Sequence, residues 1–405
     1  MVEGGCLTRV PADHRHEADA TSSCRRWATC AMAAPLQRMG QPRNPHSLPL
    51  YGALVLMGVT LLLTAGCVYT RAFTDTHRRV IPGSVATMEM VTVGGVSQSI
   101  WFRGVSRSNP PLILLHGGPG ASESALFRYY NAALEQHFLV VYWEQRGTGR
   151  SFHADIPPAS MTIERFVRDL DEVVALVGRR FGKDKVVLLG HSWGTVLGTI
   201  YASRHPEKVL AYVGVAQIAD MQQGDRLSFA FALSEARRRG NAKAISALER
   251  VGPPPYTSVA ERLAVGRWVE RFGGVFHAPL STGKLIGAAL STDEANLIDL
   301  VKFGQGNRFS LRQLDAEFSQ LHLSEHYRAF DVPIYFLLGR YDWHVPAVLA
   351  AHYFATIRAP CKRLVWFEAS AHNPPFEEPE TFNRLLIEEV LPSVDERRIQ
   401  TCGST

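Results

Sequence analysis

The most constraining feature of this 405-residue chain is a G-x-S-x-G pattern that directly follows an apolar run. Residues 190–194 have the sequence GHSWG, the run before them (185–189) is KVVLL, and residues 195–201 (TVLGTIY) are typical of a buried helix. Where a strand turns sharply into a helix, the turn exposes the serine hydroxyl, and glycines on either side let the backbone close. We therefore predict that Ser192 is a nucleophile on such an elbow. The alternative is a tight turn with an exposed serine.

A nucleophilic serine of this kind needs backbone N–H donors for the oxyanion that forms on the attacked carbonyl group. An earlier apolar run, residues 112–115, is followed at once by HGGPG at residues 116–120. A glycine-rich loop after an earlier strand usually supplies one donor, and the residue after the nucleophile supplies the other. We predict that the N–H groups of Gly118 and Trp193 form the oxyanion hole, with Gly117 as the alternative to Gly118.

The acid and the base should follow the serine in the chain order Ser, Asp or Glu, His. Asp342 lies just after the apolar run 333–338, and His372 lies just after the run 363–367. Open α/β sheets place their sites at the carboxyl ends of strands. We predict that His372 is the general base and that Asp342 orients it, with no metal or organic cofactor required. Glu368 is the alternative acid, but it lies too close in sequence to His372 to orient it easily.

Taken together, these motifs resemble the proline iminopeptidase family of α/β-hydrolases. The resemblance covers roughly residues 85–392 and rests on HGGPG at 116–120, WEQRGTGRS at 143–151, GHSWG at 190–194, Asp342 and His372. It implies an α/β-hydrolase fold with a mostly parallel eight-stranded sheet and an inserted helical cap. It also implies a serine exopeptidase that removes an N-terminal residue, often proline, from short peptides.

The chain departs from that family at the residues expected to bind substrate. Glu144 stands where the family usually has Asp, and no motif identifies the cap glutamates that hold the substrate amine. Glu235 in the cap and Glu144 are our candidates for substrate contacts, together with Gly117. Arg146 could anchor a substrate carboxylate through its paired donors, but the need of a buried arginine for fixed partners favours a structural role. Asp220, Asp225 and Glu235 lie near the entrance of the cap, but each is more typical of a solvated helix charge, because charged side chains are mostly exposed.

The pattern of apolar residues predicts an interrupted α/β domain. Residues 88–93 and 96–102 alternate around Gly94 and Gly95, which indicates a hairpin, and the helical spacing after Thr162 predicts a helix capped by that residue. We expect a first part of the α/β-hydrolase core at residues 85–218 and a second part at 329–395. The intervening residues 219–328 are too apolar for a linker and should form a mainly helical cap.

Composition excludes several other classes of protein. The chain is 46% hydrophobic and 20% charged, as in ordinary globular proteins. Its net charge of +5 is too small to indicate a nucleic-acid partner, and residues 237–239 (RRR) are typical of a solvated helix face. Of the six cysteines only Cys361 lies inside the expected domain, so we expect no disulfide framework.

The N-terminal region carries a second informative segment. Residues 48–69 contain no charged residue and are long enough to cross a bilayer. They could form a retained transmembrane anchor. Alternatively, they could be a lipoprotein-type signal with Cys67 as the lipid-modified residue, if translation starts at Met39, although Thr64 is unusual for such a signal. Residues 1–47 would be a disordered or artefactual extension. Both interpretations attach the protein to a membrane, with the catalytic domain outside the cytoplasm in a bacterial envelope.

Three functions remain open from the sequence. The first is an aminopeptidase acting on short peptides, and the second is a carboxylesterase acting on small acyl esters with the same three residues. They differ in the cap, because an aminopeptidase needs an acidic group for the substrate amine. The third is an inactive, tethered binding protein, which is disfavoured because Ser192, Asp342 and His372 are all present. Nothing in the sequence indicates the oligomeric state.

Overall fold

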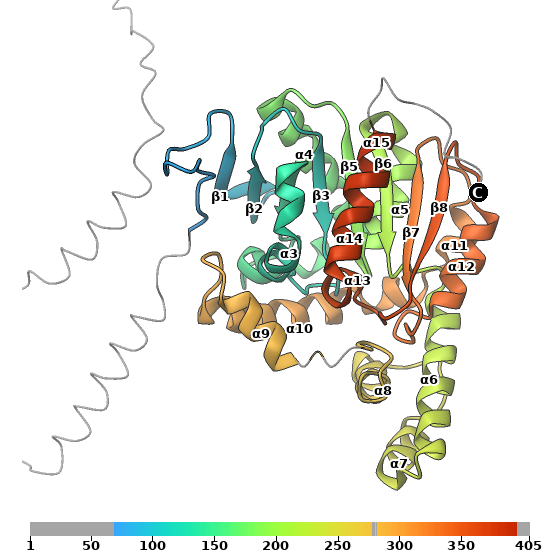
Figure 1. Ribbon diagram of the computed structural model, residues 1–405. Helices are drawn as coiled ribbons and strands as arrows, with labels where there is room; N and C mark the ends of the chain where they lie inside the picture. The colour runs from blue at the N-terminus through green and yellow to red at the C-terminus, as the bar shows by residue number, and fades with distance from the viewer. Residues whose placement is uncertain (1–68, 278–279, 281, 395–405) are drawn as a thin grey trace, which may run out of the picture. The chain divides into compact units, whose positions relative to one another are not determined.

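The computed structural model describes residues 69–277, 280 and 282–394, which contain one eight-stranded sheet (Figure 1). The strand order is β1-β2-β4-β3-β5-β6-β7-β8, with β1 and β2 antiparallel to their neighbours and all other pairs parallel. The strands are β1 (Val85–Val93), β2 (Val96–Gly104), β3 (Pro111–Leu115), β4 (Leu139–Trp143), β5 (Val186–His191), β6 (Val209–Val215), β7 (Ile334–Gly339) and β8 (Lys362–Phe367). The mostly parallel eight-stranded sheet predicted from the sequence is confirmed.

The central strands are buried on both faces, which explains their continuous apolar runs. In β3, for example, Ile113 and Leu115 pack into the core beneath α4, α5 and α12, while Leu112 and Leu114 pack on the opposite side. The helices of the first face are α4 (Ile163–Phe181), α5 (Gly194–Arg204) and α12 (Ala347–Thr356), and those of the second are α3 (Ser124–Asn131), α13 (Pro374–Glu377) and α14 (Pro379–Leu385).

Two local predictions can be checked at their turns and caps. Gly94 and Gly95 join β1 to β2 with φ values of 57° and 77°, the left-handed conformation that a two-residue hairpin turn requires. The Thr162 side chain accepts a hydrogen bond from the Arg165 N–H at the start of α4, and Gly182 ends that helix with φ 66°. The predicted hairpin and the predicted cap of this helix are therefore confirmed.

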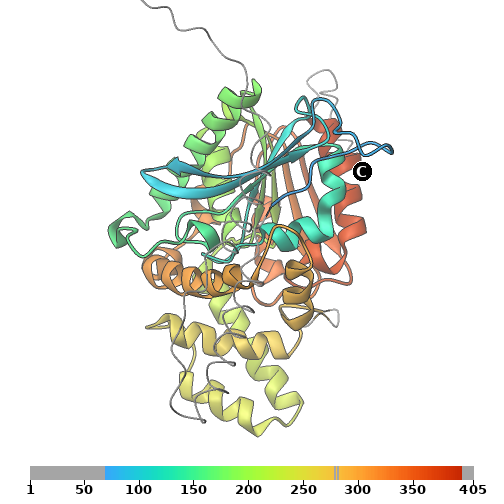
Figure 2. The same ribbon diagram turned by 90° about the vertical axis from the view of Figure 1, so that its left-hand side faces the viewer.

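The segment between β6 and β7 forms a helical cap within the expected residues 219–328. Its helices are α6 (Met221–Arg238), α7 (Ala242–Val251), α8 (Val259–Arg271), α9 (Thr282–Leu290), α10 (Leu297–Ser319) and α11 (Leu323–His326). Helices α6, α7 and α8 enclose a small core of their own around Phe229, Leu248 and Trp268. Figure 2 shows the orange α10 running between one edge of the sheet region and the yellow-green helices α6–α8. The long helix α10 therefore lies between part of the sheet and these cap helices, while Ser228 on α6 donates a hydrogen bond to the Trp343 carbonyl oxygen in the loop after β7.

The expectations for the N-terminal region concern residues that the structure does not describe, so they stay predictions. No helix in the ranges given above is long and apolar enough to span a membrane. The extension 1–47 lies outside the described residues, and so does the apolar segment 48–69 apart from Tyr69. Cys361 is disulfide-bonded.

Candidate active site

Ser192 stands on the sharp turn between β5 and α5, and its φ of 51° is in the left-handed region. The glycines on either side are required by backbone contacts. A Cβ on Gly194 would lie 1.8 Å from the Leu115 carbonyl oxygen in β3, and one on Gly190 would lie 2.7 Å from the Gly194 carbonyl oxygen. The structure therefore contains the strand–turn–helix elbow that the GHSWG pattern predicts. This elbow packs closely against β3.

His372 and Asp342 meet at the carboxyl ends of the last two strands. His372 Nδ1 lies 2.9 Å from Asp342 Oδ2, and Asp342 Oδ1 accepts hydrogen bonds from the N–H groups of His344 and Val345, both at 2.9 Å. His372 lines the same cavity as Ser192. The alternative acid, Glu368, points elsewhere, because its exposed carboxylate pairs with Arg340.

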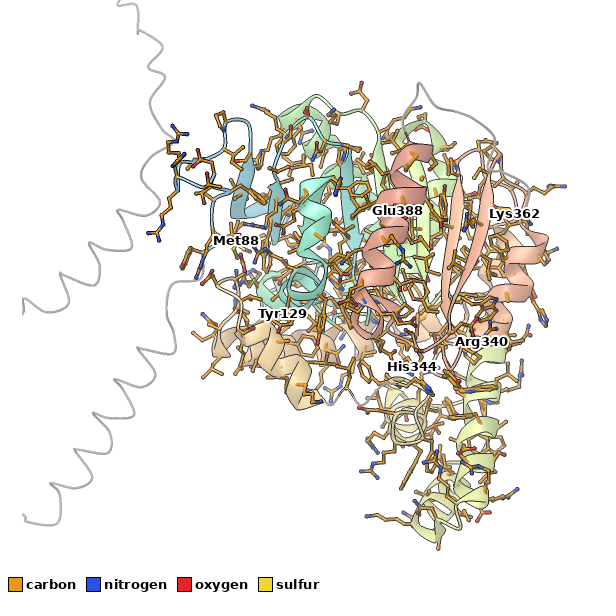
Figure 3. The ribbon with its side chains drawn as sticks, in the orientation of Figure 1. Met88, Tyr129, Arg340, His344, Lys362 and Glu388 are labelled. Carbon is orange, nitrogen blue, oxygen red and sulfur yellow. The ribbon has the colours of Figure 1, made fainter. Side chains whose placement is uncertain are left out.

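Burial controls the protonation of these groups. It lowers the pKa of His372 well below the usual value, and the positive charge of His191 lowers it further. Burial also raises the pKa of Asp342, whereas the backbone N–H bonds of Val345 and His344 oppose that change. The pKa of His344 is lowered to about 4, again mainly by burial. His344 packs edge-on to the His372 ring, 4.7 Å away, and Figure 3 labels it near α8 and the base of α6. A neutral imidazole at position 372 can accept a proton.

The glycine-rich loop lies directly beside the nucleophile. Gly117 and Gly118 both line the Ser192 cavity, and a Cβ on Gly117 would lie 3.5 Å from the Ser192 Cβ. Gly118 has a φ of 123° and no room for a side chain, since a Cβ would lie 2.4 Å from the Gly120 nitrogen. Trp193 is the N-cap residue of α5, and its indole N–H donates to Gln145 at 2.8 Å. The structure thus brings the expected oxyanion residues and Ser192 together.

A buried ion pair that the sequence did not reveal lies next to His372. His191 Nδ1 is 2.8 Å from Glu123 Oε1, and His191 Nε2 is 3.0 Å from the His372 carbonyl oxygen. Both ring nitrogens therefore face acceptors, which requires a proton on each. Burial by itself would lower the pKa of His191, but the Glu123 carboxylate outweighs it and the pKa is raised. None of the sequence motifs contains Glu123, so this contact could not be predicted from them.

The cavity in front of Ser192 has a volume of about 330 Å³ and lies between the core and the cap. Its cap side is mostly apolar, with Leu263, Val265, Val269, Val275, Phe276, Leu311 and Phe318 among its walls. Its polar groups include Glu123, whose Oε2 has no hydrogen-bond partner in the described part of the chain. They also include Asp225, which pairs with Arg262 at 3.1 Å. The cavity therefore combines a mostly apolar cap side with a set of polar and charged groups around Ser192, as small-molecule sites usually do.

Two of the predicted substrate contacts lie outside this cavity. Arg146 is almost completely buried and binds Asp169 through two nitrogens, at 2.9 and 3.0 Å, which assigns it the structural role. Glu144 lines a different cavity, where Ser122 donates to one oxygen and the Arg150 N–H to the other, each at 2.7 Å. Neither position supports a contact with a substrate bound at Ser192.

The prediction that Glu235 contacts substrate is also not supported by its position. Its carboxylate accepts hydrogen bonds from Arg238 and Arg239 on the last turn of α6, and it does not line the Ser192 cavity. These neighbouring arginines lower its pKa to about 2. The side chains of residues 237–239 are solvent-exposed, as expected for a solvated helix face. Glu235 is therefore a surface charge that pairs within its own helix.

One cluster in the described residues has donors suited to a metal ion, namely Asp220, His322 and Glu325. Both oxygens of Asp220 are already hydrogen-bonded. Asp220 caps α6 through the Gln223 N–H at 2.7 Å, and its other oxygen lies 2.6 Å from His322 Nδ1. The cluster joins the start of α6 to the segment before α11, and we assign no metal to it.

Comparison with known proteins identifies the class. Residues 110–246 match the family model of the alpha/beta hydrolase fold. Over 305 residues the chain is 33% identical to a probable aminopeptidase, YbaC, of Bacillus subtilis, covering 75% of this chain and 96% of that protein. A shorter match, 34% identity over 122 residues, joins 30% of this chain to 37% of the proline iminopeptidase of Neisseria gonorrhoeae.

Solved structures agree at the level of fold. The crystal structure of the Mycobacterium smegmatis proline iminopeptidase matches with a TM-score of 0.55 and 19% identity, covering 76% of this chain and 99% of the other. The crystal structure of VinJ matches with a TM-score of 0.56 and 23% identity, over 76% of this chain and 99% of the other. This chain belongs to the α/β-hydrolase family. Within it, the chain is a proline iminopeptidase-like enzyme of the serine hydrolase class.

Proposed function

We propose that this protein is a membrane-associated serine aminopeptidase that removes the N-terminal residue from short peptides. The observation that carries the proposal is the left-handed Ser192 in one cavity with His372, which is held by Asp342. The near full-length similarity to a probable aminopeptidase supports the choice of a peptide substrate.

The chemistry follows from the positions of these groups. His372 takes the hydroxyl proton of Ser192 as the oxygen attacks the carbonyl carbon of the scissile bond. The backbone N–H groups of Gly118 and Trp193 donate to the oxyanion of the tetrahedral intermediate. His372 then returns the proton to the leaving amine and afterwards activates a water molecule that releases the acyl group from Ser192. Asp342 keeps the imidazole in the tautomer with its Nδ1 protonated.

Glu123 is our candidate for the group that binds the substrate's free amine. It lines the cavity, its pKa is lowered because the charge of His191 outweighs the effect of burial, and its Oε2 has no partner among the described residues. The unpaired oxygen is buried in the wall of the cavity, and it can accept a hydrogen bond from an ammonium group once the side chain turns it toward the cavity. The cap carboxylate of Asp225 is less suited, because Arg262 already neutralises it.

An esterase acting on small acyl esters is the second candidate. It is favoured by the apolar cap side of the cavity and by the pairing of Asp225 with Arg262, since an ester needs no acidic group beside it. The two functions share the same nucleophile, so they differ only in the substrates that are turned over.

The experiment that tests the proposal is a substrate panel for wild type and Ser192→Ala. Prolyl, alanyl and other aminoacyl amides are compared with short and long acyl esters. We expect hydrolysis of aminoacyl amides, and a loss of about 10⁴-fold or more in kcat for Ser192→Ala because the nucleophile is removed. Activity that survives this substitution would exclude the mechanism. Turnover of esters alone would exclude the peptidase and leave the nucleophile in place.

The role of Glu123 is tested with Glu123→Gln, which keeps the size of the side chain and removes its charge. We expect KM for alanyl amides to rise about tenfold to a hundredfold, because a hydrogen bond to a charged group is lost. KM for propionyl esters, which have no amine, should hardly change. An equal rise in KM for both substrates would show that Glu123 supports the site without binding the amine.

Membrane attachment by residues 48–69 is the remaining part of the proposal. Its support is the length of this segment and its lack of charged residues. Either a transmembrane helix or a lipid on Cys67 would hold the enzyme at a membrane.

A further inference from the structure

The helices α9 and α10 carry a concentration of exposed apolar side chains. Twelve large hydrophobic residues are exposed in the described part of the chain, and five of them lie on these two helices, with 39 to 60% of their surface accessible. These five, which we call the α9–α10 patch, are Ile286, Leu297, Ile298, Val301 and Phe303. Val301 lies four residues after Leu297 and three after Ile298, so these three side chains share one face of α10, whereas Ile286 and Phe303 line a cavity beside it. Exposed apolar side chains grouped in this way are typical of an interaction site, whereas single ones need no explanation.

Two exposed tyrosines belong to the same region. Tyr129 is on α3, which packs against α9, and Figure 3 labels it close to that helix. Tyr69 is the first described residue, and its N–H donates to the carbonyl oxygen of Asp293 in the loop between α9 and α10, at 3.3 Å. Both tyrosines are 51% exposed. Tyrosine is enriched where proteins meet the interface between membrane and water.

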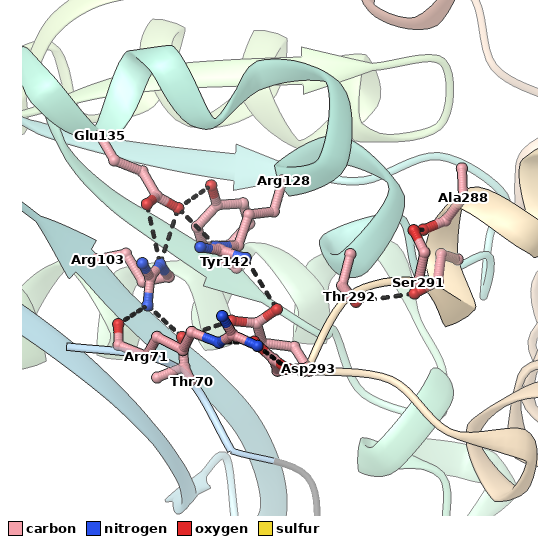
Figure 4. Close-up of polar contacts among 12 residues, drawn as sticks. Thr70, Arg71, Arg103, Arg128, Glu135, Tyr142, Ala288, Ser291, Thr292 and Asp293 are labelled. Carbon is pink, nitrogen blue, oxygen red and sulfur yellow. Dashed lines mark hydrogen bonds and ion pairs between the residues drawn. The ribbon is translucent and has the colours of Figure 1, made fainter. Parts of the chain in front are cut away.

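The chain is tied to the α9–α10 loop directly after residue 69. Thr70 donates a hydrogen bond to Glu294 Oε1 at 2.7 Å, and Arg71 pairs with Asp293 at 3.0 Å (Figure 4). Both acidic residues lie between the end of α9 and the start of α10. The place where the chain enters the folded unit is therefore on the same pair of helices as the patch.

A buried network of charges fixes this arrangement to the core. Arg103 on β2 binds both oxygens of Glu135, at 2.9 and 3.0 Å, and its Nη1 donates to Thr70 and to the Arg71 carbonyl oxygen. Arg128 on α3 joins Glu135 at 3.1 Å to Glu294 at 2.9 Å (Figure 4). The Glu294 side chain is 0% exposed. Moving the α9–α10 loop would leave buried charges unpaired. Thr70 and the patch are therefore held in a fixed position relative to each other.

We propose that the α9–α10 patch rests on the phospholipid bilayer, as a second contact beside the N-terminal segment. This inference builds on the membrane attachment proposed above. Residues 48–69 contain no charged residue, and the last of them, Tyr69, is bonded to the α9–α10 loop. The chain therefore enters the described unit beside the patch. Burial of exposed apolar side chains at the boundary of headgroups and acyl chains is favourable, as for other helices that lie on membranes.

The contact has a consequence for the active site. Helix α10 carries the patch on its first turns, and its later residues Asn307, Leu311 and Phe318 line the Ser192 cavity. The bilayer contact therefore holds one wall of the active site close to the membrane surface.

The test uses the full chain in vesicles of phosphatidylethanolamine and phosphatidylglycerol that contain a trace of phospholipid with a photoreactive diazirine acyl chain. After illumination, the cross-linked peptides are identified by mass spectrometry. We expect lipid adducts both in residues 48–69 and on the patch between Ile286 and Phe303. The exposed Val348 on α12, 42% accessible, is the internal control and should carry none.

The matched variant is Leu297→Glu combined with Val301→Glu. It should lower adduct formation on α9 and α10 about tenfold, because two apolar contacts become charged. Adducts in residues 48–69 should remain, and thermal unfolding should match that of wild type. Adducts in residues 48–69 alone would overturn the patch contact and leave the attachment standing, whereas no adducts in either region would overturn the attachment itself. Protein–protein cross-links joining the patches of two copies would assign the patch to a dimer instead.

Discussion

The left-handed backbone of Ser192 is stabilised by hydrogen bonds on both sides of the residue. Its N–H donates to the Val215 carbonyl oxygen at 3.0 Å, and its own carbonyl oxygen accepts from the N–H and the hydroxyl of Thr195 at 2.9 and 2.6 Å. Such a conformation costs about 1–3 kcal/mol in a residue with a side chain. It persists because these hydrogen bonds and the close packing of Gly194 on Leu115 hold the turn in this conformation.

At the same scale, the charge on His191 should set the pH dependence of the enzyme. Burial and this charge lower the pKa of His372, so the base form is populated at neutral pH and activity falls as pH drops through that lowered pKa. His191→Gln removes the charge and raises the pKa of His372. We therefore expect the acid limb of the kcat/KM profile to move to higher pH.

The measurement is the profile of kcat/KM for an alanyl amide between about pH 4 and pH 8, which covers the usual range of histidine. His205→Gln is the control, because His205 follows the far end of α5 and should leave the profile unchanged. An acid limb that stays in place or moves to lower pH in His191→Gln would contradict the assignment of a positive charge to His191.

At the scale of elements, the elbow depends on how closely β5 and α5 approach β3. Gly194→Ala would place a Cβ 1.8 Å from the Leu115 carbonyl oxygen, which only a shift of the backbone could relieve. We expect the free energy of unfolding to fall by about 3 kcal/mol, as for other overpacked sites. Chemical denaturation followed by circular dichroism measures this change.

Gly304→Ala in α10 is the matched control, because a Cβ there meets nothing within 4 Å and alanine favours helix. It should be neutral or slightly stabilising. Equal stabilities for the two variants would mean that the elbow does not pack on β3 as described.

The helices and strands differ in how well the local sequence pattern predicts them. The hairpin at Gly94 and Gly95, the helix after Thr162 and the strand before Ser192 follow from local patterns, and the structure has them. The position of α10 across the active site does not follow from such a pattern. Its apolar residues face the Ser192 cavity, the core and the patch at different points along the helix, so no single apolar stripe marks one buried face.

At the scale of the whole molecule, residues 48–69 should hold the protein in the membrane fraction. The measurement is fractionation of cells that express the full chain or Cys67→Ser. A lipid on Cys67 predicts that the substitution moves the protein to the soluble fraction, because the acyl anchor is lost. A transmembrane helix predicts that it stays, because the apolar segment is intact. A soluble wild-type chain would contradict attachment by either route.

The sequence by itself determined which residues are candidates for the chemistry. The predicted nucleophile, acid and base each follow an apolar run, and their order along the chain matches one catalytic arrangement, so local patterns sufficed to propose Ser192, Asp342 and His372 for these roles. Only the tertiary structure decided what surrounds them. Glu123 meets His191 across 68 residues of sequence, a contact set by the parallel pairing of β3 with β5 in the sheet.

The same reason explains the predicted substrate contacts that the structure did not support. Glu144, Arg146 and Glu235 have plausible residue types, but each is satisfied by neighbours away from the cavity. Whether a charge faces a substrate or a partner depends on which segments fold beside it. Residue type and spacing do not contain that information, whereas the packing of the cap on the sheet does.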